Sequence, residues 1–325
     1  MKLVNYFIRE NEFMTGAEII SFLSNNFPTV INAVGSVVGG LFTAIFLRRN
    51  TSAAEFEKIK NGQFKEVADS LLKAGKMTYV EYYQASNFLE IARKADKYYS
   101  EISHDNNNAN YDFDWFVRFY EAVGNISDEA MQELWAKLLA GEVAEPSSFS
   151  LKTIDVLRNL SKKDAELFSL VCSHSVMTRG ESYFLPHYDT YLKKHNIYYA
   201  DIMKLNEQGL IFNDGTIGVS ISITHDFNAL FWNNELIMTT VLSDGKDIEV
   251  DIKAYPFTQA GHEIATLVSK SISEEGFIEL ARQIVDENKE YTLEVHKIVN
   301  LDEKSIRYES KNLLEPISSN EENIT

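Results

Sequence analysis

Hydrophobic and polar residues follow three different patterns along this chain. No charged residue occurs between residues 19 and 47. From about 51 to 175, apolar residues recur at steps of three and four, which is typical of helices that bury one face. From 217 onward, apolar residues alternate with small or polar ones, which favours strands. The patterns predict a mainly α protein with a smaller α+β part.

The uncharged stretch contains a segment with the length of a membrane-spanning helix. Residues 28–47 would measure about 30 Å as a helix, which matches the hydrocarbon thickness of a bilayer. Pro28 suits the first helical turn, where its missing N–H costs nothing. We predict a transmembrane helix over about 28–47. The alternative is a helix buried in the core of a soluble oligomer, because Asn32, Ser36 and several glycines weaken insertion into lipid.

Small residues line one face of this predicted helix. They are spaced four residues apart in two neighbouring rows, which lets two membrane helices approach backbone to backbone. Membrane lipid and a second copy of the chain are therefore the expected partners, and we expect a homo-oligomer. The residues of this face are Gly35, Ser36, Gly39, Gly40 and Ala44.

Two basic residues, Arg48 and Arg49, follow the apolar segment directly. The positive-inside rule then places the long C-terminal part in the cytoplasm and leaves a single membrane pass. A cleaved signal peptide is not expected, because the apolar stretch begins late and ends in two arginines.

A helical domain is predicted over residues 51–175. Apolar side chains recur there at alternating steps of three and four, which indicates the seam of a packed helix pair: Phe88, Ile91, Ala95, Tyr98 and Ile102. The sequence Thr78-Tyr79-Val80-Glu81 is a capping box at the start of that helix. A later helix, capped by Ser127-Asp128-Glu129, is expected to end at Gly141. The aromatic side chains between Phe113 and Val123 are expected in the core.

The C-terminal part is predicted to combine helices with strands. Residues 176–272 have the element order of an elaborated winged-helix-like module. Its predicted elements are helices over Pro186–Lys194 and Ala200–Gln208, strands over Ile217–Ile223, Leu236–Leu242 and Ile248–Ile252, and a closing helix that begins at Thr258. Residues 273–325 add a helix, a strand and an acidic tail. The predicted domains are therefore 1–50, 51–175, 176–272 and 273–325.

Charge and cysteine content narrow the classes of function. The formal net charge of −17 would repel phosphate backbones, so nucleic acid is disfavoured as a partner. The one cysteine, Cys172, excludes a disulfide within the chain and is consistent with a reducing compartment. We therefore expect an acidic protein with most of its chain in the cytoplasm.

Motifs of the common enzyme classes are absent from the sequence. No P-loop, dinucleotide-binding glycine motif, nucleophile elbow or zinc-protease motif occurs. Cys172, His174, His187 and His195 match no standard zinc spacing, so we expect a structural cysteine, surface histidines, no metal and no cofactor.

The carboxylates near Trp135 are the other candidates for chemistry. Glu133 and Glu142 are expected near opposite ends of one helix, on a solvated face, with no nucleophile beside them. A non-enzyme is the prediction, and an enzyme without a recognisable motif is the most remote alternative.

The sequence of the central block resembles a known group of proteins. The residues that carry the likeness are Glu133–Glu142, Pro146–Ser150, Thr153–Ala165, Leu205-x-x-x-Gly209-Leu210-Ile211 and Pro256-Phe257-Thr258-x-x-Gly261. Over about 127–268 the chain resembles bacterial domain-of-unknown-function proteins related to the Abi-alpha abortive-infection group. The resemblance implies phage defence at the bacterial inner membrane and supplies no catalytic residues. The motifs describe packing rather than chemistry.

Two functional hypotheses follow. The first is a membrane-associated, self-associating anti-phage protein whose cytoplasmic domains respond to a protein or phage-derived trigger and act through the N-terminal helix. The alternative is a soluble, cytoplasmic, oligomeric interaction or regulatory module with a winged-helix-like domain and no catalysis.

Overall fold

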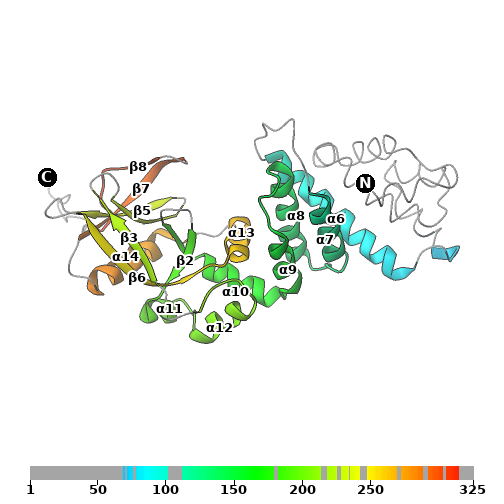
Figure 1. The fold of residues 1–325 in the computed structure, drawn as a ribbon, viewed down its shortest axis with the longest axis horizontal. Coiled ribbons are helices and arrows are strands. Elements are labelled where there is room, and N and C mark those ends of the chain that lie inside the picture. Colours follow the sequence, from blue (N-terminus) through cyan, green and yellow to red (C-terminus); the bar gives the residue numbers. More distant parts are fainter. Residues whose placement is uncertain are drawn as a thin grey trace, which may run out of the picture. The chain divides into compact units, whose positions relative to one another are not determined.

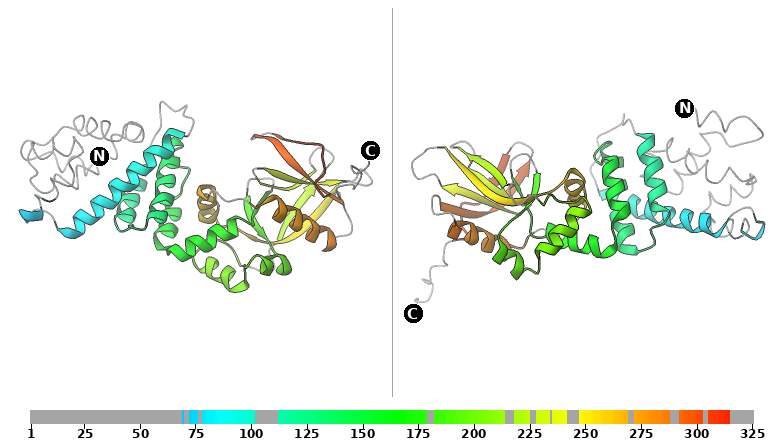
Figure 2. Two further views of the ribbon diagram at one scale, coloured as in Figure 1. Left: turned by 180° about the vertical axis from the view of Figure 1, so that it is seen from behind. Right: turned by 60° about the horizontal axis from the view of Figure 1, so that its bottom comes forward.

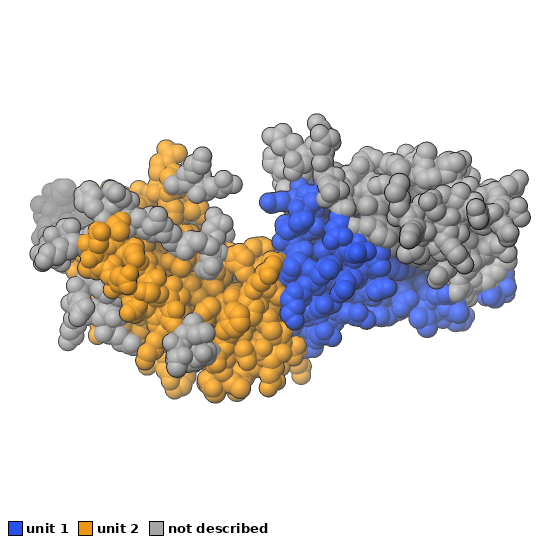
Figure 3. All heavy atoms as spheres, viewed as in Figure 1, with its two compact units in different colours: residues 1–162 blue, residues 163–325 orange. Residues whose placement is uncertain are grey.

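The computed structural model describes most of the chain between residues 69 and 314. Residues 1–162 and 163–325 form two compact units, which Figure 3 shows in different colours. The described residues are 69, 72–75, 78–101, 112–178, 182–213, 218–224, 228–233, 235–241, 247–268, 272–287, 292–302 and 305–314. The predicted transmembrane segment lies outside them. None of the described helices has both the length and the apolar character needed to cross a bilayer.

Helices make up the described part of the first unit. Its core lies where α6 packs along α8, and Ile91, Ala95, Trp135 and Leu138 are fully buried there. Of the predicted seam, Phe88, Ile91 and Ala95 are buried, as predicted, and Tyr98 is half-buried. Ile102 lies outside the described residues. The helices are α6 (Tyr79–Glu101), α7 (Phe113–Val123), α8 (Glu129–Ala144) and α9 (Leu151–Asn159) (Figure 1).

Side-chain caps set the starts of these helices. At α6, the hydroxyl of Thr78 accepts from the N–H of Glu81, while the Glu81 carboxylate accepts from the N–H of Thr78, so the predicted capping box is confirmed. At α8, the Asp128 carboxylate accepts from the N–H groups of Ala130 and Met131. Each cap satisfies N–H groups that have no partner within the helix.

The predicted end of α8 at Gly141 is wrong, because the helix continues to Ala144. A Cβ atom at position 141 would lie 2.7 Å from the ring of Phe149. Gly141 therefore allows the turn after α8 to pack closely against the helix. The helix itself ends three residues later, at Ala144.

An eight-stranded antiparallel sheet organises the second unit. The strand order is β3-β6-β2-β1-β4-β5-β7-β8, and the sheet curves as a half-barrel (Figure 2). The strands are β1 (Val176–Thr178), β2 (Ser182–Pro186), β3 (Gly218–Ile223), β4 (Ala229–Trp232), β5 (Leu236–Val241), β6 (Ile248–Pro256), β7 (Thr292–Asp302) and β8 (Ser305–Tyr308).

Helices in this unit cover the sheet and connect its strands. The longest, α14, packs against β5 and β7, and its buried Phe277, Leu280 and Ile284 face a core that includes Leu293 and Val295. The helices are α10 (Lys162–Cys172), α11 (Asp189–Lys194), α12 (Tyr199–Glu207), α13 (Gln259–Leu267) and α14 (Glu274–Glu287) (Figure 1).

The predicted mixture of helices and strands is confirmed, but the sheet is larger than a winged-helix-like module over 176–272 would contain. The predicted strands around Ile217–Ile223, Leu236–Leu242 and Ile248–Ile252 correspond to β3, β5 and β6. β7 pairs with β5 along its length, from Leu236 opposite Lys297 to Val241 opposite Thr292. Strands before and after residue 272 thus belong to one sheet.

Two motifs that lie far apart in the sequence meet in this unit. Ile211 forms an isolated bridge with Phe257, and the N–H of Phe212 donates to the carbonyl of Pro256 over 2.8 Å. Thr258 donates its hydroxyl to the carbonyl of Gly209 and accepts from the N–H of Gly261, so the predicted helix start at Thr258 is confirmed. This junction joins the end of α12 to the start of α13.

Candidate functional site

α7 and α9 pack side by side in the helical unit, and local contacts fix which faces they expose. At the start of α7, the Asp112 carboxylate accepts from the N–H of Asp114 over 2.9 Å. On the buried face, Trp115 stacks on Phe119 with ring centroids 5.3 Å apart, and its indole N–H donates to the carbonyl of Phe149. Since these aromatic side chains cannot leave the core without a large loss of burial, the rotation of α7 is fixed.

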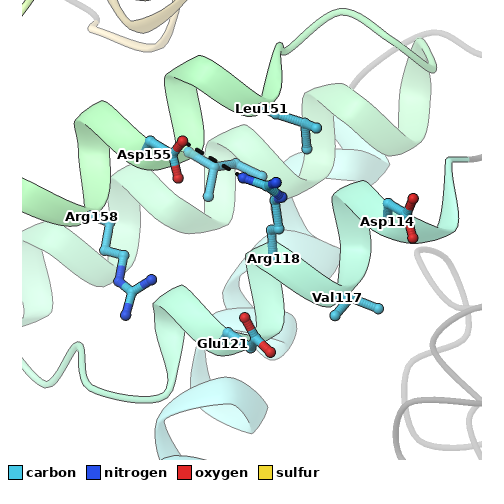
Figure 4. A pocket seen from close by; sticks show the side chains of 8 residues that line it. Asp114, Val117, Arg118, Glu121, Leu151, Asp155 and Arg158 are labelled. Carbon is cyan, nitrogen blue, oxygen red and sulfur yellow. Dashed lines mark ion pairs between the residues drawn. The ribbon is translucent and has the colours of Figure 1, made fainter.

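A groove with a volume of about 420 Å³ lies between the two helices (Figure 4). Each helix contributes four residues at positions i, i+3, i+4 and i+7, which is one face over two turns. The lining residues are Asp114, Val117, Arg118 and Glu121 from α7, and Leu151, Ile154, Asp155 and Arg158 from α9. The groove therefore follows the helix axes rather than forming a closed cavity.

The charges in the groove are only loosely satisfied. Arg118 lies 3.7 Å from Asp155 across the groove, and both side chains are about half exposed, 51% and 53%. An exposed pair of this kind is worth at most about 1 kcal/mol, so a ligand can replace either partner. Among the described residues, the side chains of Asp114, Glu121 and Arg158 have no hydrogen-bond or ion-pair partner, and Figure 4 shows Glu121 and Arg158 pointing into the groove.

This lining favours binding of a charged segment over catalysis. Pockets for small molecules have similar volumes but are mostly apolar, whereas three carboxylates and two guanidinium groups line this groove. Apart from its three carboxylates, the lining has no side chain that could act as a nucleophile. A helix or extended peptide that carries both charges fits the chemistry best.

The residues predicted to mediate membrane insertion and self-association lie outside the described part of the chain. These are the face Gly35, Ser36, Gly39, Gly40 and Ala44 and the flanking Arg48 and Arg49. The prediction for these residues therefore rests on the sequence alone.

The carboxylates near Trp135 are held apart, as predicted, but the expectation of a solvated face is wrong for Glu142. Its side chain is buried, with 1% of the residue exposed, and accepts hydrogen bonds from the N–H groups of Ser147 and Phe149. Burial raises the pKa of Glu142, although these hydrogen bonds oppose the shift. Glu142 therefore fixes the turn between α8 and α9.

Glu133 has a different environment on the other part of α8. The Tyr98 hydroxyl donates to its carboxylate over 2.6 Å, and the ammonium of the buried Lys94 lies 2.9 Å away. The hydrogen bond from Tyr98 lowers the pKa of Glu133, and Lys94 adds to this shift. The carboxylate of Glu129 lies 3.9 Å from the same ammonium, so this cluster of opposite charges ties α6 to α8.

The structure brings two of the four predicted metal-ligand candidates together. The rings of His174 and His195 have centroids 4.3 Å apart, and His174 Nδ1 lies 2.9 Å from the hydroxyl of Tyr191. His195 Nε2 lies 3.4 Å from the carboxylate of Glu279 on α14. Both histidines are half-buried, so the prediction of surface histidines is wrong for them.

The other two candidates lie elsewhere. Cys172 is buried on α10, as predicted, and burial raises the pKa of its thiol. His187 pairs instead with the hydroxyl of Tyr255 and the carboxylate of Asp189. Within the described ranges, no three histidine, cysteine or acidic side chains are grouped so that they could hold a metal ion.

A comparison with known protein families identifies the family of this chain. A family model described as "Protein of unknown function (DUF2806)" matches residues 76–281. The chain belongs to the DUF2806 family. No curated protein and no solved structure matches the chain. The predicted domain-of-unknown-function family is thus confirmed, and its relation to the Abi-alpha group stays a prediction.

The DUF2806 match includes parts of both units and ends within α14, before β7 and β8. It includes the groove between α7 and α9, the Glu142 turn and the junction of Leu210 with Gly261. The glycine-lined N-terminal segment precedes the matched residues. The groove was not predicted from the sequence, because charged residues on a helix face are ordinarily solvated.

Proposed function

We propose that this DUF2806 chain is a non-catalytic regulatory protein that binds a partner in the α7/α9 groove. The observation that carries the proposal is the pair of matching helix faces, with Glu121 and Arg158 directed into one groove and Asp114 at its edge (Figure 4). Within the described part of the chain, these three side chains have no hydrogen-bond or ion-pair partner. A partner segment that supplies a basic group to the carboxylates and an acidic group to Arg158 would satisfy all three. Such charge-assisted contacts are stronger than neutral hydrogen bonds.

The proposed output of this binding is a change at the N-terminal segment. The predicted helix over 28–47, with its glycine face, would hold the chain in the bacterial inner membrane and bring copies together. We propose that the partner is a protein or phage-derived trigger, and that the protein acts in phage defence. Support for this part comes from the N-terminal sequence pattern and from the resemblance to the Abi-alpha group.

A charge reversal in the groove tests the proposal. Bacteria that express the full chain are challenged with a panel of phages, and plaque numbers are compared for wild type, Arg158→Glu and Lys152→Glu. Lys152 is exposed on the same helix but does not line the groove, so its reversal is a matched control. We expect wild type and Lys152→Glu to protect and Arg158→Glu to lose protection at an equal protein level. A wild-type chain without protection against any phage contradicts the defence role.

The alternative function is a soluble oligomeric regulator without a membrane anchor. The order α11, short turn, α12 and then strands favours it, because winged-helix-like modules share this order. α12, however, carries Asp201 and Glu207, and its Lys204 pairs with Asp164, so its face suits a protein partner better than a phosphate backbone. Fractionation of the full chain beside a chain that lacks residues 1–50 separates the hypotheses. A full chain that is soluble without detergent supports the alternative.

A further inference from the structure

The two ends of the eight-stranded sheet differ in how their edges are protected. At one end, β8 has four residues, one of which is Arg307, and its pairing with β7 contains a register shift. Charged residues, short length and bulges are devices that keep a sheet edge from pairing with another chain. This end carries all three.

The chain beyond β8 closes this end further. The N–H groups of Glu309 and Leu313 donate to the carbonyls of Lys297 and Val295 on β7. The side-chain oxygen of Asn312 accepts from the N–H of Val295 over 3.1 Å. An asparagine side chain thus replaces a strand partner, and the backbone of β7 is left with few free groups.

The opposite end, β3, has none of these devices. Its sequence Gly-Val-Ser-Ile-Ser-Ile has no charge and no proline, and its six residues pair with β6 in an unbroken register. No described strand pairs with its outer side. Every second backbone N–H and carbonyl of an edge strand points away from its partner. Within the described part of the chain, β3 therefore offers a row of donors and acceptors that no strand covers, although its last residues approach β4.

The side chains of β3 are compatible with pairing to an identical strand. Ser220 and Ser222 are exposed on one face, whereas Ile221 and Ile223 are buried on the other. Two such strands related by a twofold axis pair antiparallel, keep their apolar faces on the same side and place no like charges opposite each other. A strand of another protein would need the same alternation of exposed polar and buried apolar residues, which a second copy of β3 always has.

We propose that β3 is a self-association edge that pairs antiparallel with β3 of a second copy of this chain. The contact joins two half-barrel sheets into one continuous sheet. Six residues of pairing form a weak contact alone, and any second contact between the copies strengthens it through effective concentration. The proposal is independent of the α7/α9 groove.

Cysteine cross-linking in the full-length chain tests this edge directly. Ser220→Cys and Ser222→Cys are introduced singly, and Ser305→Cys on the exposed β8 edge is the matched control. The thiol-specific cross-linker must span the about 7–8 Å between diagonal neighbours in an antiparallel pair, so that either register is detected. The native Cys172 is buried and does not compete.

We expect at least one of the two β3 variants to yield a cross-linked dimer at least tenfold more abundant than the Ser305→Cys control. Dilution of the sample should lower the yield, because the contact joins separate chains. Equal yields at both edges, or no dimer from either β3 variant, would overturn the proposal.

Discussion

Gly261 packs so closely against Leu210 that a Cβ atom at position 261 would lie 1.9 Å from the Leu210 carbonyl oxygen. The same carbonyl accepts a hydrogen bond from the N–H of Thr258 over 3.0 Å. The turn after α12 and the first turn of α13 are therefore held together by backbone contacts that only glycine permits. This explains why the two motifs of the sequence lie together although Leu210 and Thr258 are 48 positions apart in the chain.

Replacement of Gly261 by alanine should destabilise the second unit. The Leu210 carbonyl is backbone and cannot rotate away, so the added methyl group costs about 1–3 kcal/mol of unfolding free energy. Gly276→Ala is the control. Its Cβ atom would lie 3.2 Å from side-chain atoms rather than from backbone, and alanine has a higher helix propensity than glycine. Urea unfolding should show a lower midpoint for Gly261→Ala alone, and equal midpoints would contradict the close approach.

Loss of the Glu142 carboxylate should destabilise the helical unit. Glu142→Ala leaves the N–H groups of Ser147 and Phe149 without their acceptor in a buried turn, at a cost of about 2–3 kcal/mol. Glu145→Ala, three residues along and exposed, should change stability by less than about 0.5 kcal/mol. Unfolding in urea, followed by far-UV circular dichroism, compares the two variants. A Glu142→Ala chain as stable as Glu145→Ala would show that the turn does not depend on this carboxylate.

Acid should destabilise the second unit through His174. Burial, and then the neighbouring His195, lowers the pKa of His174 to about 4, against an ordinary value of 6.5. The unfolded chain therefore takes up the proton first, so the stability is present above about pH 6.5 and is lost as the pH falls toward 4. Solvent reaches the half-buried ring, which limits the loss to roughly 2 kcal/mol. Glu279 acts in the same direction at lower pH, because its hydrogen bond from Lys194 lowers its pKa.

His174→Gln isolates this contribution. Glutamine retains a partner for the Tyr191 hydroxyl but cannot be protonated. Thermal unfolding at pH 7 and at pH 4.5 should show a smaller acid-induced decrease for the variant than for wild type. An identical decrease in both proteins would assign the acid sensitivity to other groups.

Substitution in the glycine face should abolish the proposed membrane function. Gly39→Leu or Gly40→Leu places a branched side chain where two helices are expected to touch, so protection against phage should be lost while expression stays intact. Val38→Leu changes the other side of the same predicted helix and should retain protection. If the glycine variants protect as well as wild type, the glycine face has no functional role.

Local features of this fold could be predicted from the sequence, whereas long-range ones could not. The capping residues Thr78 and Thr258 act within four residues, so their roles follow from short motifs. The sheet order depends on pairing between distant strands, and β4, Ala229–Trp232, is buried at all four positions and lacks the alternation that reveals a strand. β1 and β2 are too short to give a clear pattern.

The functional site also depends on long-range contacts that could not be predicted from the sequence. Glu142 carries a charge that normally implies solvent, and only the fold of the 145–149 turn over it creates its burial. The groove was visible only as two charged helix faces. The one pattern that could have revealed it is the shared i, i+3, i+4, i+7 spacing of charged and apolar residues in Asp114–Glu121 and Leu151–Arg158.

Site-specific photo-cross-linking in cells tests most directly whether the α7/α9 groove binds a partner. A photoreactive amino acid at Val117, which lines the groove, is compared with the same probe at Lys152, which lies on α9 outside it. We predict a discrete adduct from position 117 that is absent from position 152 and that disappears when Arg158→Glu is added. An adduct that is equal at both positions, or one that Arg158→Glu leaves unchanged, would contradict the proposed binding site.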